Sequence, residues 1–65
     1  MKLYSRTRAA EVIDEYVPNE KYRCVLKLRL CEDMGYEAIG EAVGYSTQWV
    51  KDIVRRYRPE IMSLL

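Results

Sequence analysis

Hydrophobic residues recur at helical spacing in four segments of the chain, which Pro, Asn and Gly residues separate. In the first segment, charged side chains lie on one side of a helical wheel and small or apolar side chains on the other. The apolar side holds Ala9, Ala10, Val12, Ile13, Tyr16 and Val17. The residue before a proline avoids helical angles, and Asn19 can cap the next helix. The pattern therefore predicts a helix over about residues 6–17 that ends before Pro18.

The second segment, about residues 20–33, is apolar around much of its circumference. Its apolar residues are Tyr22, Cys24, Val25, Leu26, Leu28, Leu30 and Cys31. A helix of this kind is usually buried by several neighbours, so we expect it at the centre of the fold. Long basic side chains can bury their stems and extend their charges into water, so Arg23, Lys27 and Arg29 are expected to point outward. Gly35 is expected to close the helix.

A short third helix is predicted over residues 36–43. Ile39 and Val43 are four residues apart, which places both on one face of this helix. Gly40 has no side chain and would let a second helix cross closely. Gly44 stands where a helix ends most easily in the left-handed conformation that glycine adopts at little cost.

The fourth segment begins after Ser46, whose hydroxyl can cap a helix over residues 47–58. Its apolar stripe is Val50, Ile53, Val54 and Tyr57. Pro59 is expected to stop this helix and to begin a last short turn or helix over residues 60–65. We expect this apolar tail to fold back onto the core, the alternative being contact with another subunit. Tyr45, in the turn, is expected to fill the core rather than to contact a base.

The spacing of these residues matches the helix-turn-helix motif of DNA-binding proteins. The pattern is apolar at 39, small at 40, apolar at 43, Gly at 44, and apolar at 45, 50 and 53. The sequence therefore predicts an all-α fold, a compact bundle of four short helices, or five if the tail forms its own. We expect one domain over residues 1–65, with the motif at about residues 36–57.

Composition limits the classes of protein that fit this chain. Its 65 residues are 49% hydrophobic, which is enough for one small core. No apolar run approaches the roughly 20 residues that span a bilayer, and the start of the chain lacks the apolar core of a secretion signal. With two cysteines and no histidine, a zinc site lacks ligands. We expect Cys24 and Cys31 to be reduced thiols in the core, with no metal and no cofactor.

Charge is unevenly distributed, although the net charge is only +1. Residues 1–8 carry three basic residues and no acid, and residues 51–58 carry four basic residues against one acid. Residues 9–50 carry four basic residues against eight acids. The second basic cluster falls on the helix that the motif assigns to DNA, which favours DNA contact. Without the motif, the same cluster would indicate a solvated face with local ion pairs.

Polar residues on the fourth helix are the candidates for DNA contact. They are Ser46, Thr47, Gln48, Trp49, Lys51, Asp52, Arg55, Arg56 and Arg58. Gln48 can bond bidentately to adenine, Arg55 can do so to guanine, and Asp52 can accept from a cytosine amino group. The lysine and the other arginines suit phosphates, as do the backbone N–H groups at the helix start. Trp49 is expected either to pack under Arg56 or the third helix, or to touch sugar–phosphate or a thymine methyl.

The run from Tyr22 to Tyr57 resembles the domain of bacterial sigma factors that reads the −35 promoter element. That family has a helix of the type R-x-V-L-x-L-R before its helix-turn-helix, matched here by Arg23, Val25, Leu26, Leu28 and Arg29. In the motif itself, the matching residues are Tyr36, Glu37, Ile39, Gly40, Val43, Gly44 and Ser46. The resemblance implies a helical DNA-binding domain with residues 47–56 in the major groove. The other sigma-factor regions cannot fit in 65 residues, so a small phage or mobile-element regulator is the nearer likeness.

These observations favour sequence-specific binding of double-stranded DNA by a small transcriptional regulator. It is expected to be cytoplasmic, bacterial or phage-encoded, and associated with the nucleoid rather than a membrane. A module this small reads few base pairs, so a homodimer or a partner such as RNA polymerase is expected. One alternative is a protein-interaction adaptor, whose functional face would include the acidic Glu37 and Glu41. The other is a DNA-binding fragment of a recombinase or transposase. No nucleophile stands beside a base, so no enzyme is expected.

Overall fold

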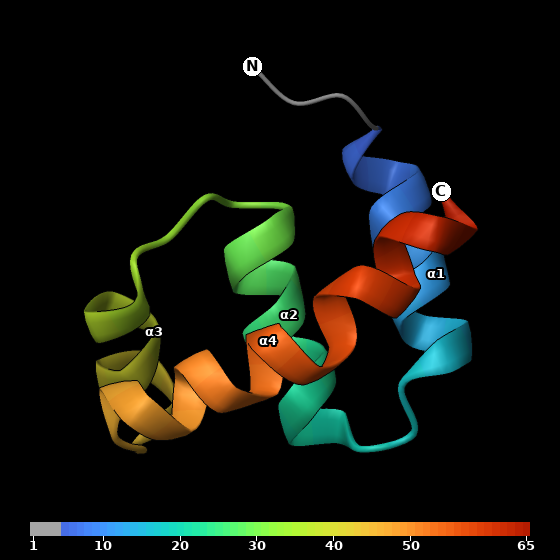
Figure 1. Ribbon diagram of the computed structural model, residues 1–65. Coiled ribbons are helices and arrows are strands. Elements are labelled where there is room, and N and C mark those ends of the chain that lie inside the picture. The colour runs from blue at the N-terminus through green and yellow to red at the C-terminus, as the bar shows by residue number, and fades with distance from the viewer. Residues whose placement is uncertain (1–4) are drawn as a thin grey trace.

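The computed structural model describes residues 5–65, which form four helices and no strand (Figure 1). The helices are α1 (Arg6–Tyr16), α2 (Glu20–Leu30), α3 (Tyr36–Val43) and α4 (Thr47–Leu64). The all-α class is therefore confirmed. Lys2, which belongs to the basic N-terminal segment, lies outside the described residues. In the described part of the chain, no helix is both long enough and apolar enough to cross a membrane.

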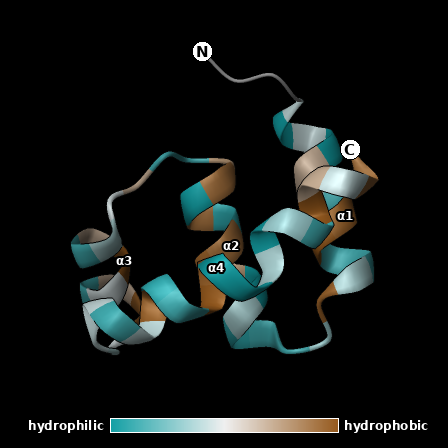
Figure 2. Cartoon of the chain, in the orientation of Figure 1, coloured by the Kyte–Doolittle hydropathy of each residue, from teal (hydrophilic) through white to brown (hydrophobic). Residues whose placement is uncertain are grey.

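Helices α2 and α4 form the centre of the fold. Each of them packs against the three other helices, whereas α1 and α3 lie at opposite ends and meet no part of each other (Figure 1). Each helix carries hydrophobic residues among hydrophilic ones, as the colouring of Figure 2 shows. The buried cluster consists of Val12, Ile13, Val17, Val25, Leu26, Leu30, Ile39, Val50, Ile53, Val54 and Ile61. The predicted central position of the second helix is correct, and α4 shares it.

The first two helices begin as their capping residues indicate. The Ser5 hydroxyl accepts from the backbone N–H of Arg8, and the Asn19 side chain accepts from the N–H groups of Lys21 and Tyr22. Each bond satisfies a donor that the helix itself leaves without a partner. The predicted start of both helices is therefore confirmed.

Helix α2 ends earlier than predicted, at Leu30 rather than near residue 33. The residue that takes the left-handed conformation is Asp33, with φ of 58°, whereas Gly35 has φ of −70° and caps the start of α3. Aspartate tolerates this conformation better than most residues because its short polar side chain can bond locally. Cys24 is exposed and only Cys31 is buried, so the expectation of two core cysteines was wrong for Cys24.

Helix α4 is longer than predicted, because it continues through Pro59 to Leu64. Proline removes one backbone hydrogen bond and clashes with the preceding turn, which is why it was expected to end the helix. Here Ile61, two residues further on, is fully buried, and this burial offsets the lost bond. The tail therefore folds back onto the core as expected, but as part of α4 and not as a fifth helix. Its end lies beside α1 (Figure 1).

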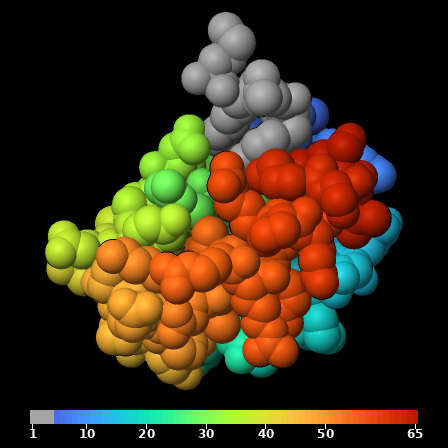
Figure 3. All heavy atoms as spheres, viewed as in Figure 1, coloured from blue at the N-terminus to red at the C-terminus, as the bar shows by residue number. Residues whose placement is uncertain are grey.

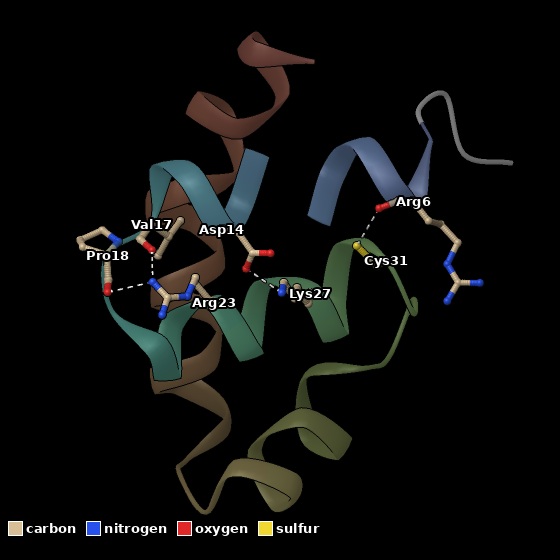
Figure 4. Close-up of polar contacts among 7 residues, drawn as sticks. All are labelled: Arg6, Asp14, Val17, Pro18, Arg23, Lys27 and Cys31. Carbon is tan, nitrogen blue, oxygen red and sulfur yellow. Dashed lines mark hydrogen bonds and ion pairs between the residues drawn. The ribbon is translucent and has the colours of Figure 1, made fainter. Parts of the chain in front are cut away.

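Basic residues of α2 hold α1 in place instead of all pointing into water (Figure 4). Arg23 donates from Nη1 to the carbonyl oxygens of Val17 and Pro18, at 2.8 and 3.0 Å, and so fixes the loop between the helices. Lys27 Nζ lies 2.7 Å from an Asp14 carboxylate oxygen. The expectation that these side chains point outward was incomplete, because the loop carbonyls and the Asp14 carboxylate offer Arg23 and Lys27 partners on α1 and its loop.

Candidate nucleic-acid interface

The turn between α3 and α4 depends on two glycines. Gly44 ends α3 in the left-handed conformation, with φ of 79°. A Cβ on Gly40 would lie 2.7 Å from the carbonyl oxygen of Tyr45, closer than such atoms approach. The same glycine accepts the N–H groups of both Gly44 and Tyr45 at its carbonyl oxygen. The close approach predicted at Gly40 is therefore present, although the crossing segment is the turn itself.

Ser46 sets the start of α4. Its hydroxyl accepts the backbone N–H of Trp49 at 3.1 Å, so its predicted role as a cap is confirmed. The other N–H groups of the first turn have no acceptor within the helix and can meet an anion. Thr47, the first helical residue, is half-buried. With the turn rigid at Gly40 and the cap formed, the direction of α4 relative to α3 is set by backbone contacts.

The outer face of α4 carries three polar side chains that interact with one another. Gln48 Nε2 donates to an Asp52 carboxylate oxygen at 3.0 Å, and an Arg55 guanidinium nitrogen lies 3.9 Å from the same oxygen. All three residues are exposed. Helical spacing of three or four residues brings them together on one side of the helix. The face can offer a paired amide and guanidinium to base edges. In Figure 3 this half of α4 lies at the surface of the molecule.

One edge of that face is basic and includes a residue from α2. The Arg29 guanidinium lies 4.5 Å from the centre of the Tyr36 ring, and Lys51 Nζ lies 5.9 Å from the same centre. Arg58 and Arg29 both line a groove of about 150 Å³ next to this ring. We call these four residues, Arg29, Tyr36, Lys51 and Arg58, the Tyr36 flank. Arg29 and Lys51 thus lie over one tyrosine at the start of α3, and Arg58 shares its groove, which the acidic Asp33 also lines.

The opposite edge of the face is aromatic and basic. The rings of Tyr45 and Trp49 stack, with centroids 4.0 Å apart and planes 20° apart. Lys21 Nζ donates to the Tyr45 hydroxyl at 3.1 Å and also lies 4.7 Å from the centre of that ring. Arg56 is on the same side of α4 as Trp49, since the two are seven residues apart. We call Lys21, Tyr45, Trp49 and Arg56 the Trp49 flank.

One sequence-based expectation changes at the Trp49 flank, and the packing partners of Trp49 become specific. Tyr45 is 41% exposed, so it does not fill the core. Trp49 is half-buried, with Tyr45 and Tyr22 as its aromatic partners, whereas Arg56 lies 5.8 Å from the ring of Tyr57. The start of α2 determines how the two rings pack, because Lys21 contacts Tyr45 and Tyr22 contacts Trp49.

The structure brings the candidate residues together in one surface with a clear order. Gln48, Asp52 and Arg55 lie along its middle, Lys51 and Arg58 on the Tyr36 flank, and Trp49 and Arg56 on the Trp49 flank. Sequence reasoning missed Lys21 as a member and assigned Arg29 only to water. The sequence signal for both residues was their position near the two ends of α2, the helix before the motif. Their distance from α4, however, depends on the angle at which the helices cross.

No family model, curated protein or solved structure matches this chain. Among residues 5–65, no three His, Cys, Asp or Glu side chains are grouped so that they could hold a metal ion.

Proposed function

We propose that this protein binds double-stranded DNA in a sequence-specific manner, with the first half of α4 in the major groove, and that it regulates transcription. The observation that carries the proposal is the fixed turn at Gly40 and Tyr45. It fixes the direction in which α4 starts, so that the inner side of the helix packs in the core and its polar face is exposed. A helix presented in this way has the width that the major groove accepts.

The order of charges across the surface supports the same proposal. A helix in the major groove lies between two phosphate backbones, so its middle should read bases and its edges should meet anions. The uncharged amide of Gln48 and the Asp52–Arg55 pair occupy the middle. The basic residues of the Tyr36 flank and the Trp49 flank occupy the two edges. This arrangement suits a groove better than it suits a flat acidic partner, which would favour one continuous basic surface.

Sequence readout would come from the three residues in the middle. Gln48 is suited to adenine, Arg55 to guanine, and Asp52 to a cytosine amino group. In the free protein the Asp52 carboxylate lies between the side chains of Gln48 and Arg55 and interacts with both. It therefore orients them before they contact DNA. An acid at this position also repels phosphate, which restricts the registers in which the helix can lie.

Selection of bound sequences from a random duplex pool tests the proposal. We expect enrichment of a short motif by the natural chain. Arg55→Ala should weaken binding by about 1–3 kcal/mol and relax the preference at one base position. Glu41→Ala, a change on the exposed side of α3, is the matched control and should leave the motif unchanged. Unchanged affinity and base preference for Arg55→Ala would overturn the assignment of α4 to the groove.

The resemblance to the −35-reading domain of sigma factors extends the proposal to the class of regulator. We propose a small phage or mobile-element regulator that acts in the cytoplasm on chromosomal or phage DNA, without catalytic activity. If no sequence is enriched at any salt concentration, the protein-interaction adaptor replaces this proposal. Binding that disappears with salt irrespective of sequence would indicate phosphate contact alone.

A further inference from the structure

Exposed hydrophobic side chains gather where α1 meets the end of α4, far from the candidate interface. Tyr16, Leu64 and Leu65 are 43%, 47% and 39% exposed. Tyr16 and Leu64 line one groove of about 270 Å³, whose other lining residues in the described part of the chain are Arg8, Val12 and Glu15. Isolated exposed apolar residues are ordinary, but three at one site beside a groove are typical of an interaction surface. We call Arg8, Val12, Glu15, Tyr16, Leu64 and Leu65 the α1–α4 surface.

Charges on this surface identify the partner. Arg8 and Glu15 are both exposed on α1, and neither has an ion-pair partner among residues 5–65. They are seven residues apart, so they lie within about 20° of each other around the helix and about 10 Å apart along it. The surface thus has one positive and one negative end, with apolar side chains between them. Two such surfaces placed antiparallel bring each arginine opposite the other copy's glutamate.

We propose that the α1–α4 surface is the interface of a two-fold homodimer. A two-fold interface requires one surface to be complementary to itself, and opposite charges at the two ends of an apolar groove satisfy that requirement. Leu64 and Leu65 of each copy supply the apolar contact, and the two Arg8–Glu15 pairs determine the antiparallel register.

Helix α4 connects the dimer interface to the candidate DNA-binding surface. The biological role of the dimer rests on the proposed DNA binding. Lys51, at the candidate interface, and Leu64, at the α1–α4 surface, belong to one helix. About 20 Å of helix separates them at 1.5 Å per residue. Two copies joined near their C-terminal ends can therefore hold their recognition segments up to roughly 40 Å apart, which spans the ~34 Å between successive major-groove faces.

Sedimentation equilibrium of the full chain without DNA tests the dimer. We expect a concentration-dependent change from the 7.7 kDa monomer to a species of twice that mass at up to about 1 mM protein. Leu64→Asp should abolish the larger species without loss of helical circular dichroism, because Leu64 is exposed. A monomer at all concentrations, or a dimer that Leu64→Asp leaves unchanged, would overturn the proposal.

A charge exchange tests the antiparallel register independently. Arg8→Glu alone and Glu15→Arg alone should each raise the dissociation constant of the dimer about tenfold, because like charges then face each other twice. An equimolar mixture of the two variants should form a heterodimer in which both charge pairs are restored, one in its natural sense and one reversed. Glu37→Arg, on α3 at the opposite end of the molecule, is the matched control. Failure of the mixture to associate more tightly than either variant alone would contradict this register.

The two proposals fail separately. A monomer that still selects one short DNA motif would remove the dimer and leave DNA binding. A dimer that selects no DNA would do the reverse. If both hold, the selected site should be a palindrome with half-sites about one helical turn apart, and Leu64→Asp should bind a single half-site with affinity unchanged.

Discussion

The carbonyl oxygen of Tyr45 lies 2.7 Å from the place where a Cβ on Gly40 would be. Residues 40 and 45 belong to opposite sides of the turn between α3 and α4, and their backbones are in direct contact there. The Gly40 carbonyl also accepts the Tyr45 N–H at 3.0 Å. The angle between the two helices therefore depends on the absence of one methyl group.

Gly40→Ala should lower the free energy of unfolding by about 1–3 kcal/mol, as expected when an added methyl forces backbone to move. Chemical denaturation measures this change. The same variant should lose DNA affinity beyond what its lower stability explains, since α4 would be displaced. Gly35→Ala is the control, because nothing lies within 4 Å of its added Cβ and its φ is −70°. Equal losses in both variants would contradict the importance of the close approach.

Arg29→Gln should reduce the slope of log affinity against log salt by about 1, because one phosphate contact is lost. It should weaken binding to all sequences alike, unlike Arg55→Ala. Lys27→Gln removes the same charge from the same helix, but Lys27 pairs with Asp14 on the side of α1. The slope should therefore stay unchanged in this control. A steep loss with Lys27→Gln and none with Arg29→Gln would place the DNA on the other side of α2.

Pro59→Ala should raise the free energy of unfolding by about 1–3 kcal/mol, since proline inside a helix removes one hydrogen bond and strains the preceding turn. Thermal and chemical denaturation measure the gain, and helical content should not fall. Ile61→Ala should instead cost about 2–4 kcal/mol, because Ile61 is fully buried. If Pro59→Ala destabilises the protein, the strain assigned to Pro59 is contradicted, and the proline instead helps to place Ile61 against the core.

The pKa of Tyr16 predicts how stability changes in alkaline solution. The Tyr16 hydroxyl donates to a Glu60 carboxylate oxygen at 2.7 Å, and this bond, with partial burial and the negative charge of Glu60, raises the pKa of Tyr16 above its usual value of 10.0. The folded state then holds this proton more tightly than the unfolded state. The bond's contribution is complete below pH 10 and is lost as the pH rises through the raised pKa of the folded state.

Tyr16→Phe should remove that part of the pH dependence. The difference in unfolding free energy between the natural chain and Tyr16→Phe should be constant near neutral pH and decrease above pH 10. The other five of the six tyrosines are present in both proteins, so their ionisation cancels in the difference. Denaturation at a series of pH values measures it. A difference that stays constant through alkaline pH would show that the bond to Glu60 does not perturb Tyr16.

Local sequence signals account for most of the helices and for the turn. Ser5, Asn19 and Ser46 each cap the helix that their position indicates, and Gly44 ends α3 in the left-handed conformation. These features depend on the conformational preference of one residue or on a bond to a neighbour three residues away. They can be recognised without knowing how the helices pack.

Packing decided the features that local preference misjudged. Pro59 ends a helix in isolation, yet here α4 continues because Ile61 is buried against the core. Tyr45 and Trp49 stack at the surface because the start of α2 lies beside them.

The sequence by itself determined the helical class, the caps, the turn at Gly44 and the polar stripe of α4, because each follows from residues close together in the chain. Only the tertiary structure decided that Lys21 and Arg29 join α4 at its two edges, and that Tyr16 and Leu64 share a groove. These pairs are far apart in the chain, and their distance depends on the angles at which the helices cross. Those angles are set by the fit of all the buried side chains together.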